Sequence, residues 1–248
     1  SVFGGGSASS AGINVSQEKA LNYSPWWRGI QIVSDAIART QVSPYRITAA
    51  EEDLEDEDDD AIKTLAKEHA SYPLLKREPN FFQTAYQWKK LMVSHKLSNG
   101  NAYSYIIRDG MTPVQLVPLD PHSTTPVIVR QDGSYWPTIP SPGDSIWYVW
   151  WQQGKAPVWL PAEDVLHFRN LSAEGVWGYS VVQKAREALG LGIAQQTHAS
   201  VFFSNGAKPG LVLTHPNKLT DETKNKLLES WQRRHAGPEN QLSTAIID

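Results

Sequence analysis

Cysteine is absent from the 248 residues of this chain. Without it the protein can form no disulfide, thiolate zinc site or iron–sulfur cluster, and it has no cysteine nucleophile. No apolar run approaches the roughly 20 residues that span a bilayer, so we expect no membrane partner. The first residues also lack the charged, apolar and small-residue order of a secretory signal peptide.

Motifs for catalysis and nucleotide binding are missing as well. The sequence has no GxxxxGK[ST] phosphate loop, no HExxH and no GxSxG. Its seven histidines are scattered without ligand spacing. Glu163 and Asp164 are adjacent, so in a strand their carboxylates would face opposite sides and could not act as a catalytic pair. In a turn before the strand at 164–168 we expect them to cap or position the chain. We therefore predict no catalytic, cofactor-binding or metal-binding residue, no cofactor and no enzymatic activity.

Negative charge is concentrated in one tract. Residues 51–60 read EEDLEDEDDD and hold nine acids, while the net charge of the whole chain is only −3. Outside the tract, 23 basic residues face 17 acidic ones, which leaves the body mildly basic at +6. That balance is compatible with contact to a polyanion but does not require it. We expect the tract to be a solvated surface loop.

The first hundred residues predict mainly helices. Residues 1–15 are rich in Gly, Ser and Ala, and we expect a flexible arm. Two helical pieces follow within 16–40, with Ser16 as a cap and Pro25 in a first turn. Ile30, Val33 and Ile37 form the predicted buried stripe of the second piece. We further expect a short strand at 42–47 and helices at about 61–71 and 83–98, the last capped by Thr84 and ended by Asn99-Gly100.

Residues 101–170 predict a mostly antiparallel sheet, because β-rich runs alternate there with Asp-Gly, Pro and Gly turns. Ten tryptophans are present, and three of them lie in the run IWYVWW. Strand alternation puts Trp147 and Trp151 on one face and Trp150 on the other. We favour packing or a subunit interface for this cluster over a stacking platform for sugars or bases.

The longest helical pattern covers residues 179–204, with Ser180 as its cap. Its many small residues include Gly190 and Gly192, each of which costs about 1 kcal/mol relative to alanine. Because glycine is costly inside a helix, we expect these two glycines to lie where a neighbouring backbone packs closely against the helix. A strand, a helix capped by Thr220 and running to about His235, and a final strand are expected afterwards. The chain looks cut within a unit at Asp248.

Four stretches in a fixed order resemble the phage portal proteins of the HK97 family. Residues 20–47 resemble the opening helix and Pro-aromatic strand of that family. Residues 72–110 are similar to its HPLxxLLxxxPNxxxTxxxFxxxLxxHLLLxGNAYxxIxRDG stretch, although Tyr72 stands where the family has His. Residues 160–191 and 202–237 match its LPPEDVLHxRG…ALGL and FFxNGAxPxGVL…HxG stretches. The acidic tract and the cluster at Trp147–Trp151 are additions.

The resemblance implies an α+β portal-type fold. Residues 16–178 would form an α/β wing with a mostly antiparallel sheet, 179–206 a long stem helix, and 207–248 the start of an α/β clip. Known members continue beyond the equivalent of Asp248. The implied function is that of a subunit in a ring, usually of twelve copies, at one capsid vertex through which double-stranded DNA is packaged and ejected.

Partners and positions follow from the same resemblance. The implied partners are further copies of the chain, double-stranded DNA that passes without specific recognition, the terminase large subunit, the head–tail adaptor and the capsid protein. The implied locations are the virion and, during assembly, the host cytoplasm. Residues implied to line the tunnel or to pack subunits are Lys184, Ala188, Gly192, Gln195, Gln196 and Asn205. Residues implied to face clip partners are Lys224, Arg233 and Arg234.

Two other functions are compatible with parts of the sequence. A Trp-rich carbohydrate-binding or hydrolytic domain would need an exposed aromatic platform beside two carboxylates about 5–9 Å apart. A monomeric nucleic-acid-binding module would need one basic face, which the spread of cations does not indicate.

Overall fold

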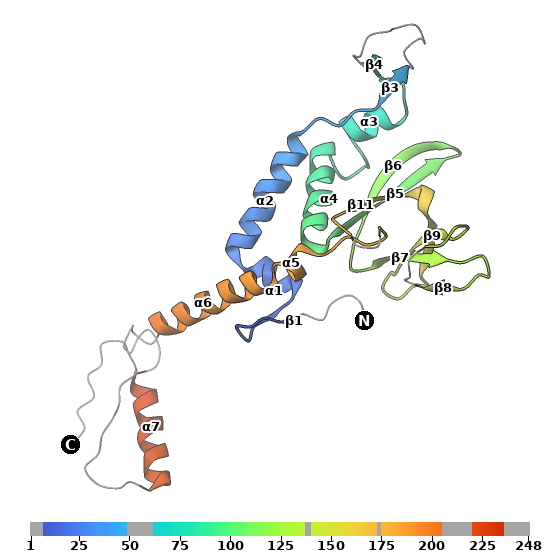
Figure 1. Ribbon diagram of the computed structural model, residues 1–248. Coiled ribbons are helices and arrows are strands. Elements are labelled where there is room, and N and C mark those ends of the chain that lie inside the picture. Colours follow the sequence, from blue (N-terminus) through green and yellow to red (C-terminus); the bar gives the residue numbers. More distant parts are fainter. Residues whose placement is uncertain (1–6, 49–61, 137–139, 173–174, 205–219, 236–248) are drawn as a thin grey trace, which may run out of the picture.

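The computed structural model describes residues 7–48, 62–136, 140–172, 175–204 and 220–235. Helix α2 (Ser24–Arg39) packs against α4 (Ala85–Asn99), and α4 packs against a sheet. Figure 1 shows this layered body, with the helix α6 (Arg186–Ser204) projecting away from it. The predicted α+β class is confirmed, since helices lie beside strands whose pairings in the described residues are all antiparallel.

The amino-terminal segment is more ordered than its composition suggests. Strands β1 (Ser7–Ala8) and β2 (Asn14–Val15) form a hairpin where we expected a flexible arm. Its order depends on tertiary contacts, because Val15 is buried in a cluster with residues more than 160 positions away. Helix α1 (Gln17–Asn22) follows, and the predicted cap is confirmed by the bond from the Lys19 amide to the Ser16 hydroxyl.

Helix α2 buries a different face from the one predicted. The residues it buries against α4 are Ile30, Ser34 and Ala38. Of the predicted stripe only Ile30 is buried, whereas Val33 and Ile37 are 42% and 47% exposed. The helix has two apolar faces, and the one with the small residues Ser34 and Ala38 lets α4 approach closely. The second face stays at the surface.

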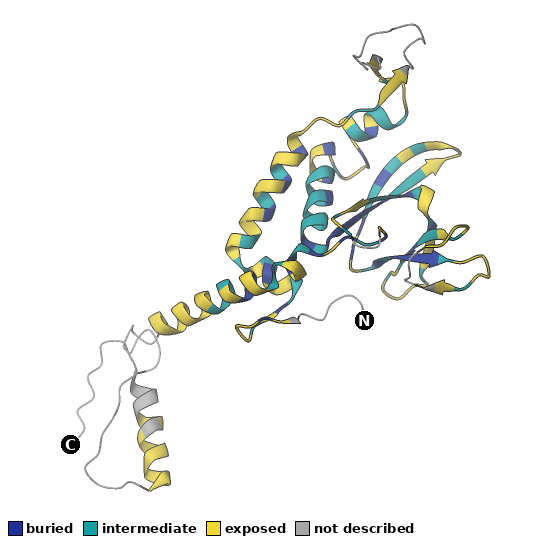
Figure 2. Cartoon of the chain, in the orientation of Figure 1, coloured by how far each residue is buried: buried dark blue, intermediate teal, exposed yellow. Residues whose placement is uncertain are grey.

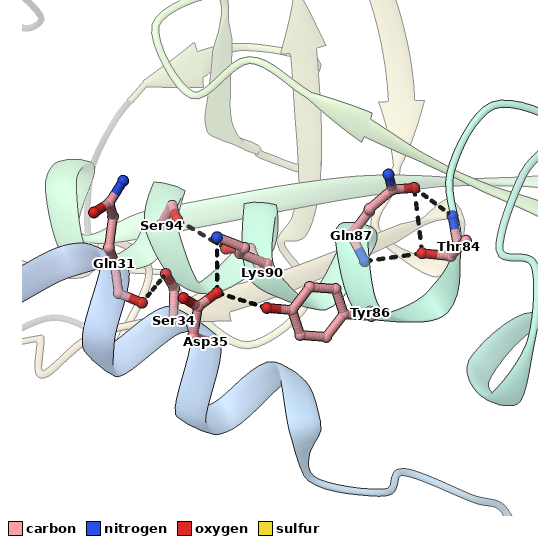
Figure 3. Close-up of polar contacts among 8 residues, drawn as sticks. All are labelled: Gln31, Ser34, Asp35, Thr84, Tyr86, Gln87, Lys90 and Ser94. Carbon is pink, nitrogen blue, oxygen red and sulfur yellow. Dashed lines mark hydrogen bonds and ion pairs between the residues drawn. The ribbon is translucent and has the colours of Figure 1, made fainter.

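Polar contacts fix α2 against α4, as Figure 3 shows. The Asp35 carboxylate accepts a hydrogen bond from the Tyr86 hydroxyl at 2.7 Å and pairs with Lys90 Nζ at 2.7 Å. The bond from Lys90 is the main cause that holds the pKa of Asp35 below its usual value. At the start of α4, Thr84 and Gln87 form a capping box, which confirms the predicted cap.

A two-stranded ribbon replaces one of the predicted helices. Strand β3 (Tyr45–Thr48) pairs with β4 (Ile62–Leu65), so the predicted helix at 61–71 is wrong, and the helix here is α3 (Ser71–Lys76). Ile62 and Leu65 are three residues apart, which fits a helix, but a short apolar run does not distinguish helix from strand. The acidic tract lies outside the described residues.

Residues 101–170 form two antiparallel sheets, which confirms the predicted sheet. One has the order β11 (Val165–Arg169), β5 (Asn101–Asp109), β6 (Thr112–Leu119). The other has the order β10 (Val158–Pro161), β9 (Ser145–Trp150), β7 (Thr124–Val129), β8 (Tyr135–Trp136). A buried cluster joins the two sheets and consists of Tyr103, Leu119, Tyr148, Leu160 and Val165.

The tryptophan run packs in part, as we favoured. Trp150 is partly buried against the cluster between the sheets, while Trp151 lies beyond the end of β9 and is exposed. Tyr135 and Trp159 meet edge to face, with an interplanar angle of 79°. An edge-to-face pair does not offer the flat double surface on which a sugar or base stacks.

Glu163 and Asp164 position the chain, as predicted. Both lie in the 3₁₀ turn η1 (Ala162–Asp164) before β11. The Asp164 carboxylate pairs with Arg108 Nε at 2.9 Å, and Arg108 also donates to the Glu163 carbonyl. The Asp164 carboxylate is thus occupied in holding the turn to β5.

His167 of β11 is a core residue. It is bonded through Nδ1 to the Tyr148 hydroxyl at 3.1 Å and through Nε2 to Asn101 Oδ1 at 2.9 Å. Because Asn101 Oδ1 accepts, Nε2 carries the proton and Nδ1 accepts from Tyr148. Burial, and secondarily Arg169, lowers the pKa of His167 to about 3.

This histidine should make stability depend on pH. Its folded pKa lies below the unfolded value, so between about pH 6.5 and its folded value the unfolded chain binds the extra proton. The stability that the neutral His167 contributes is therefore complete above about pH 6.5 and is lost as the pH falls toward its folded pKa. We expect wild type to lose about 2 kcal/mol more than His167→Gln between about pH 7 and pH 5, measured by denaturant unfolding. Equal losses in both proteins would contradict this assignment.

Two negative findings concern the described ranges only. Among them no helix is both long and apolar enough to cross a membrane. Likewise, no group of three or more His, Asp or Glu side chains in those ranges is placed to hold a metal ion.

Candidate functional site

The helix predicted at 179–204 is present as two pieces. Helix α5 (Val181–Lys184) ends at Ala185, where ψ is 12°, and α6 begins directly after it. The cap at Ser180 is confirmed, since its hydroxyl accepts from the Gln183 amide.

A tight joint holds the start of α5 to the body; we use this name for Gly100, Asn101, Asn170 and Gly178. Asn101 Nδ2 donates to the Gly178 carbonyl at 3.0 Å, and the Gly178 amide donates back to Asn101 Oδ1 at 2.8 Å. A Cβ at Gly178 would overlap the Gly100 carbonyl oxygen and the Asn170 amide. Gly100 itself has a φ of 81°, which favours glycine.

Further bonds connect the joint to the end of α4. Asn170 Nδ2 donates to the Lys96 carbonyl at 3.0 Å, and the Ser180 hydroxyl donates to the Ser98 carbonyl at 3.0 Å. Both carbonyls lie in the last turn of α4; the Lys96 carbonyl also accepts from the Gly100 amide, and the bond from Ser180 gives the Ser98 carbonyl a partner outside the helix. The carboxyl end of α4, strand β11 and the first turn of α5 are thereby held together.

The base of α6 is enclosed by the amino-terminal segment. Gly190 faces Ser9 and Val15, and Gly192 faces the Tyr23 hydroxyl, so a Cβ at either glycine would crowd those side chains. The buried residues here are Val15, Ala20, Val182 and Leu189. We expected a backbone to approach these glycines, but within the described residues the close neighbours are side chains of the same chain.

Glu187 ties the hairpin to α6. Its carboxylate accepts from the Ser10 amide at 2.8 Å and from Arg186 Nε at 3.2 Å. The bond from the Ser10 backbone is the main cause that lowers the pKa of Glu187. The first turn of α6 is therefore held by both packing and charge.

Beyond its contacts with the amino-terminal segment, α6 extends away from the body without packing against another described element. All residues from Gln195 to Ser204 are exposed, and Figure 2 shows the helix exposed on its visible side. The stretch 188–204 contains no Lys, Arg, Asp or Glu, and His198 is its only ionisable side chain. It does carry large exposed apolar side chains, among them Leu191, Val201 and Phe202. Ala188, Gln195 and Ala199 share one face with Leu191 and Phe202, because these residues are three, four or seven positions apart.

The structure places the predicted stem residues as follows. Lys184 Nζ lies 4.0 Å from the centre of the Tyr179 ring, a cation–π contact. Ala188, Gln195 and Gln196 are exposed, and Gly192 is half-buried. Asn205 lies outside the described residues.

The predicted clip helix is present as α7 (Asp221–His235). Thr220 caps it, because its hydroxyl accepts from the Thr223 amide. Lys224 pairs with Asp221 at 3.1 Å on the exposed surface. The side chains of Arg233 and Arg234 lie outside the described residues.

Sequence reasoning missed the residues that hold α6 in place. Ser9, Ser10 and Tyr23 lie far from α6 in sequence, and nothing local indicates their contact with it. Asn101 and Gly178 lie within the stretches that carry the family resemblance. Their hydrogen bonds join residues 77 positions apart, and no local pattern in the sequence indicates them.

Comparisons with known protein sequences identify one family. A family model described as phage portal protein matches residues 24–248. The chain is 26% identical to the probable portal protein of Streptomyces phage phiC31. The alignment covers all of this chain and 51% of the phiC31 protein. It is 22% identical to the portal protein of Enterobacteria phage HK97, over 91% of this chain and 48% of that one.

Solved structures include chains of similar fold. One is described as the neck of an empty GTA particle computed with C6 symmetry, with a TM-score of 0.55, 17% identity, and coverage of 94% of this chain and 58% of that one. Another is an HK97-family phage portal protein from Corynebacterium diphtheriae, with a TM-score of 0.53, 14% identity, and coverage of 92% and 63%. The chain spans about half the length of the curated relatives it matches.

Proposed function

The chain belongs to the phage portal protein family, and from this premise we propose that it is a subunit of a portal. In this role, copies of the chain form a ring at one vertex of a capsid. Double-stranded DNA passes through the ring when the genome is packaged and when it is ejected. The chain acts as a structural channel, and a separate ATPase supplies the work.

The proposal divides the chain into four parts. After an amino-terminal segment at 1–15, residues 16–178 form the wing, 179–206 the stem and 207–248 the beginning of the clip. The joint supports this division, because hydrogen bonds and close backbone packing connect the sheet to the start of the stem there. The hairpin at 7–15 then acts as a brace for the stem.

Projection of α6 is the observation that carries the proposal. A single helix that leaves its own body with Leu191, Val201 and Phe202 exposed is not a stable arrangement for a monomer in water. Copies of α6 packed around an axis would cover these side chains. Ala188, Gln195 and Ala199 share a face with Leu191 and Phe202, so this face is uncharged and mainly apolar, which suits packing between copies of α6.

The charge of α6 fits a channel for DNA. Each phosphate that a protein neutralises strengthens its salt-dependent hold on DNA. The absence of Lys and Arg from 188–204 keeps such contacts few, and Gln195 and Gln196 offer only neutral hydrogen bonds. Duplex DNA can therefore move along this surface without being retained. Lys184, Gly192 and Asn205 complete the proposed stem surface.

The remaining partners follow from the portal role. We assign the clip to the terminase large subunit and then to the head–tail adaptor, with Lys224, Arg233 and Arg234 on the contact surface. The wing meets the capsid protein. A ring of twelve copies at the virion vertex is the proposed assembly, and the ring forms in the host cytoplasm before packaging.

Electron microscopy of the purified full-length protein tests the proposal. We expect rings with a central channel, and we expect Val201→Asp to reduce ring yield because it places a charge on the surface that copies of α6 would bury. Val158→Asp, on the exposed face of edge strand β10, is the matched control and should leave rings intact. A full-length protein that stays monomeric at high concentration would contradict the proposal.

A further inference from the structure

The exposed part of α6 carries a repeating seam on the side turned away from its own chain. The seam residues recur at alternating spacings of three and four, the spacing by which one helix packs along another. They are Ala188, Leu191, Gln195, His198 and Phe202, and all five are exposed. At about 100° per residue, the seam lies nearly opposite to Leu189 and Gly190, which α6 buries. The seam is therefore left uncovered in the described part of the chain.

The opposite side of the exposed helix has small side chains. Thr197, Ser200 and Ser204 follow at spacings of three and four residues and lie about 170° around the helix from the seam; we call them the small face. The Thr197 hydroxyl donates to the Ile193 carbonyl at 2.9 Å, and the Ser204 hydroxyl donates to the Val201 carbonyl at 2.9 Å. Because these two hydroxyls have partners in their own helix, a neighbour can cover them without leaving them unsatisfied.

Two faces on opposite sides of one helix fit a ring. In a closed ring of twelve, the two neighbours meet each copy in directions about 150° apart, and two different surfaces of the chain make the contact. The seam supplies large side chains at Leu191 and Phe202, which are 53% and 40% exposed, and the small face leaves room for them. A contact between two seams would instead close as a two-fold pair.

His198 is the one ionisable residue of the seam. Residues 188–204 contain no Lys, Arg, Asp or Glu. Where α6 meets α5, β1 and β2, the charged side chains are Lys184, Arg186 and Glu187, and Arg186 pairs with Glu187 at 3.2 Å. Glu187 precedes His198 by about 16 Å along the helix. An enclosed His198 would thus find no carboxylate nearby on α6 of either copy, and burial disfavours the charged form of an imidazole.

We propose that the seam of one copy packs onto the small face of α6 in the adjacent copy and encloses His198 as the neutral imidazole. This contact rests on the ring proposed above. A copy that leaves the ring exposes His198, which can then take up a proton, whereas protonation in the ring places a charge in an apolar contact. Acid therefore favours separate copies, because the separate state binds more protons.

A fixed charge at position 198 tests the contact. His198→Lys gives the seam a permanent positive charge, and we expect it to abolish rings of the full-length protein at about pH 7.5, as counted by electron microscopy. His122→Lys, at an exposed histidine between β6 and β7, is the matched control and should leave ring yield unchanged. Normal rings in His198→Lys overturn the proposal, including rings that retain DNA at low salt because the lysine lines the channel.

The pH dependence distinguishes an enclosed neutral histidine from an ordinary polar contact. Between about pH 7.5 and about pH 5.5, the protein concentration at which half of the chains form rings should rise about tenfold in wild type and less than about twofold in His198→Gln, measured by light scattering. His122→Gln should follow wild type. All three proteins retain His167, so its effect on the stability of the wing is common to them, and circular dichroism checks that the wing stays folded.

The outcomes separate this inference from the ring itself. Equal rises in wild type and His198→Gln, with rings present, overturn the α6 contact and leave the portal proposal standing. A full-length protein that forms no ring at any pH overturns the portal proposal and this contact together.

Discussion

Gly178→Ala should lower the free energy of unfolding by about 3 kcal/mol. The new methyl group would overlap the Gly100 carbonyl oxygen and the Asn170 amide, both of which are backbone atoms. Backbone in a sheet end and a helix cap cannot turn aside as a long side chain can, so the joint must open. Denaturant unfolding followed by circular dichroism measures the loss.

Gly29→Ala is the matched control for this substitution. Gly29 lies inside α2 with no atom within contact distance of an added Cβ. Alanine is favoured over glycine in a helix by about 1 kcal/mol, so this variant should be slightly more stable than wild type. If both variants unfolded at the same denaturant concentration, the joint would not be the tight contact described here.

Asn101→Ala should be at least as damaging, with a loss of about 3–5 kcal/mol. Its amide bonds to both backbone groups of Gly178 and to His167 Nε2, and Asn101 and Gly178 are buried. Truncation leaves those three groups without partners, and each buried unsatisfied group costs about 1–3 kcal/mol. The measurement is again denaturant unfolding.

Asn99→Ala serves as its control. The Asn99 side chain makes one longer bond of 3.3 Å to the His95 carbonyl, at the end of α4. Its removal should cost less than about 1 kcal/mol. Similar losses for Asn99→Ala and Asn101→Ala would show that the Asn101 network contributes no more than an ordinary polar contact.

Both joint variants also bear on assembly. The joint fixes the first turn of α5, and α6 follows after a single residue, so a loosened joint no longer sets the direction of the stem. Ring yield in Gly178→Ala should therefore fall even at temperatures where the wing remains folded. In Gly29→Ala it should stay close to wild type.

Elements with strong local patterns were predicted correctly. Thr84, Gln87 and Gly100 mark both ends of α4 through a capping box and a left-handed glycine, and such bonds involve residues only a few positions apart. The alternating runs and turns of 101–170 likewise predicted antiparallel strands, because a strand with one buried face writes its period into the sequence.

Elements that depend on residues far away in the sequence were not predicted correctly. The hairpin at 7–15 packs against α6, and β4 forms as a strand by pairing with β3. Contact with α4 determines which face of α2 is buried. In each case the local pattern allowed two structures, and a contact between remote segments selected one of them. The acidic tract and Asn205, also subjects of prediction, lie outside the described residues.

By itself, the sequence determined the class of the fold, the ends of its well-capped helices and membership of the phage portal protein family, since these rest on residue order and on interactions along the chain. Only the tertiary structure decided that Gly100, Asn101, Asn170 and Gly178 meet in one joint, that Gly190 and Gly192 accommodate the chain's own amino-terminal segment, and that the outer part of α6 is exposed. Close packing and burial are properties of surfaces brought together in space, and a linear order of residues does not state which surfaces those are.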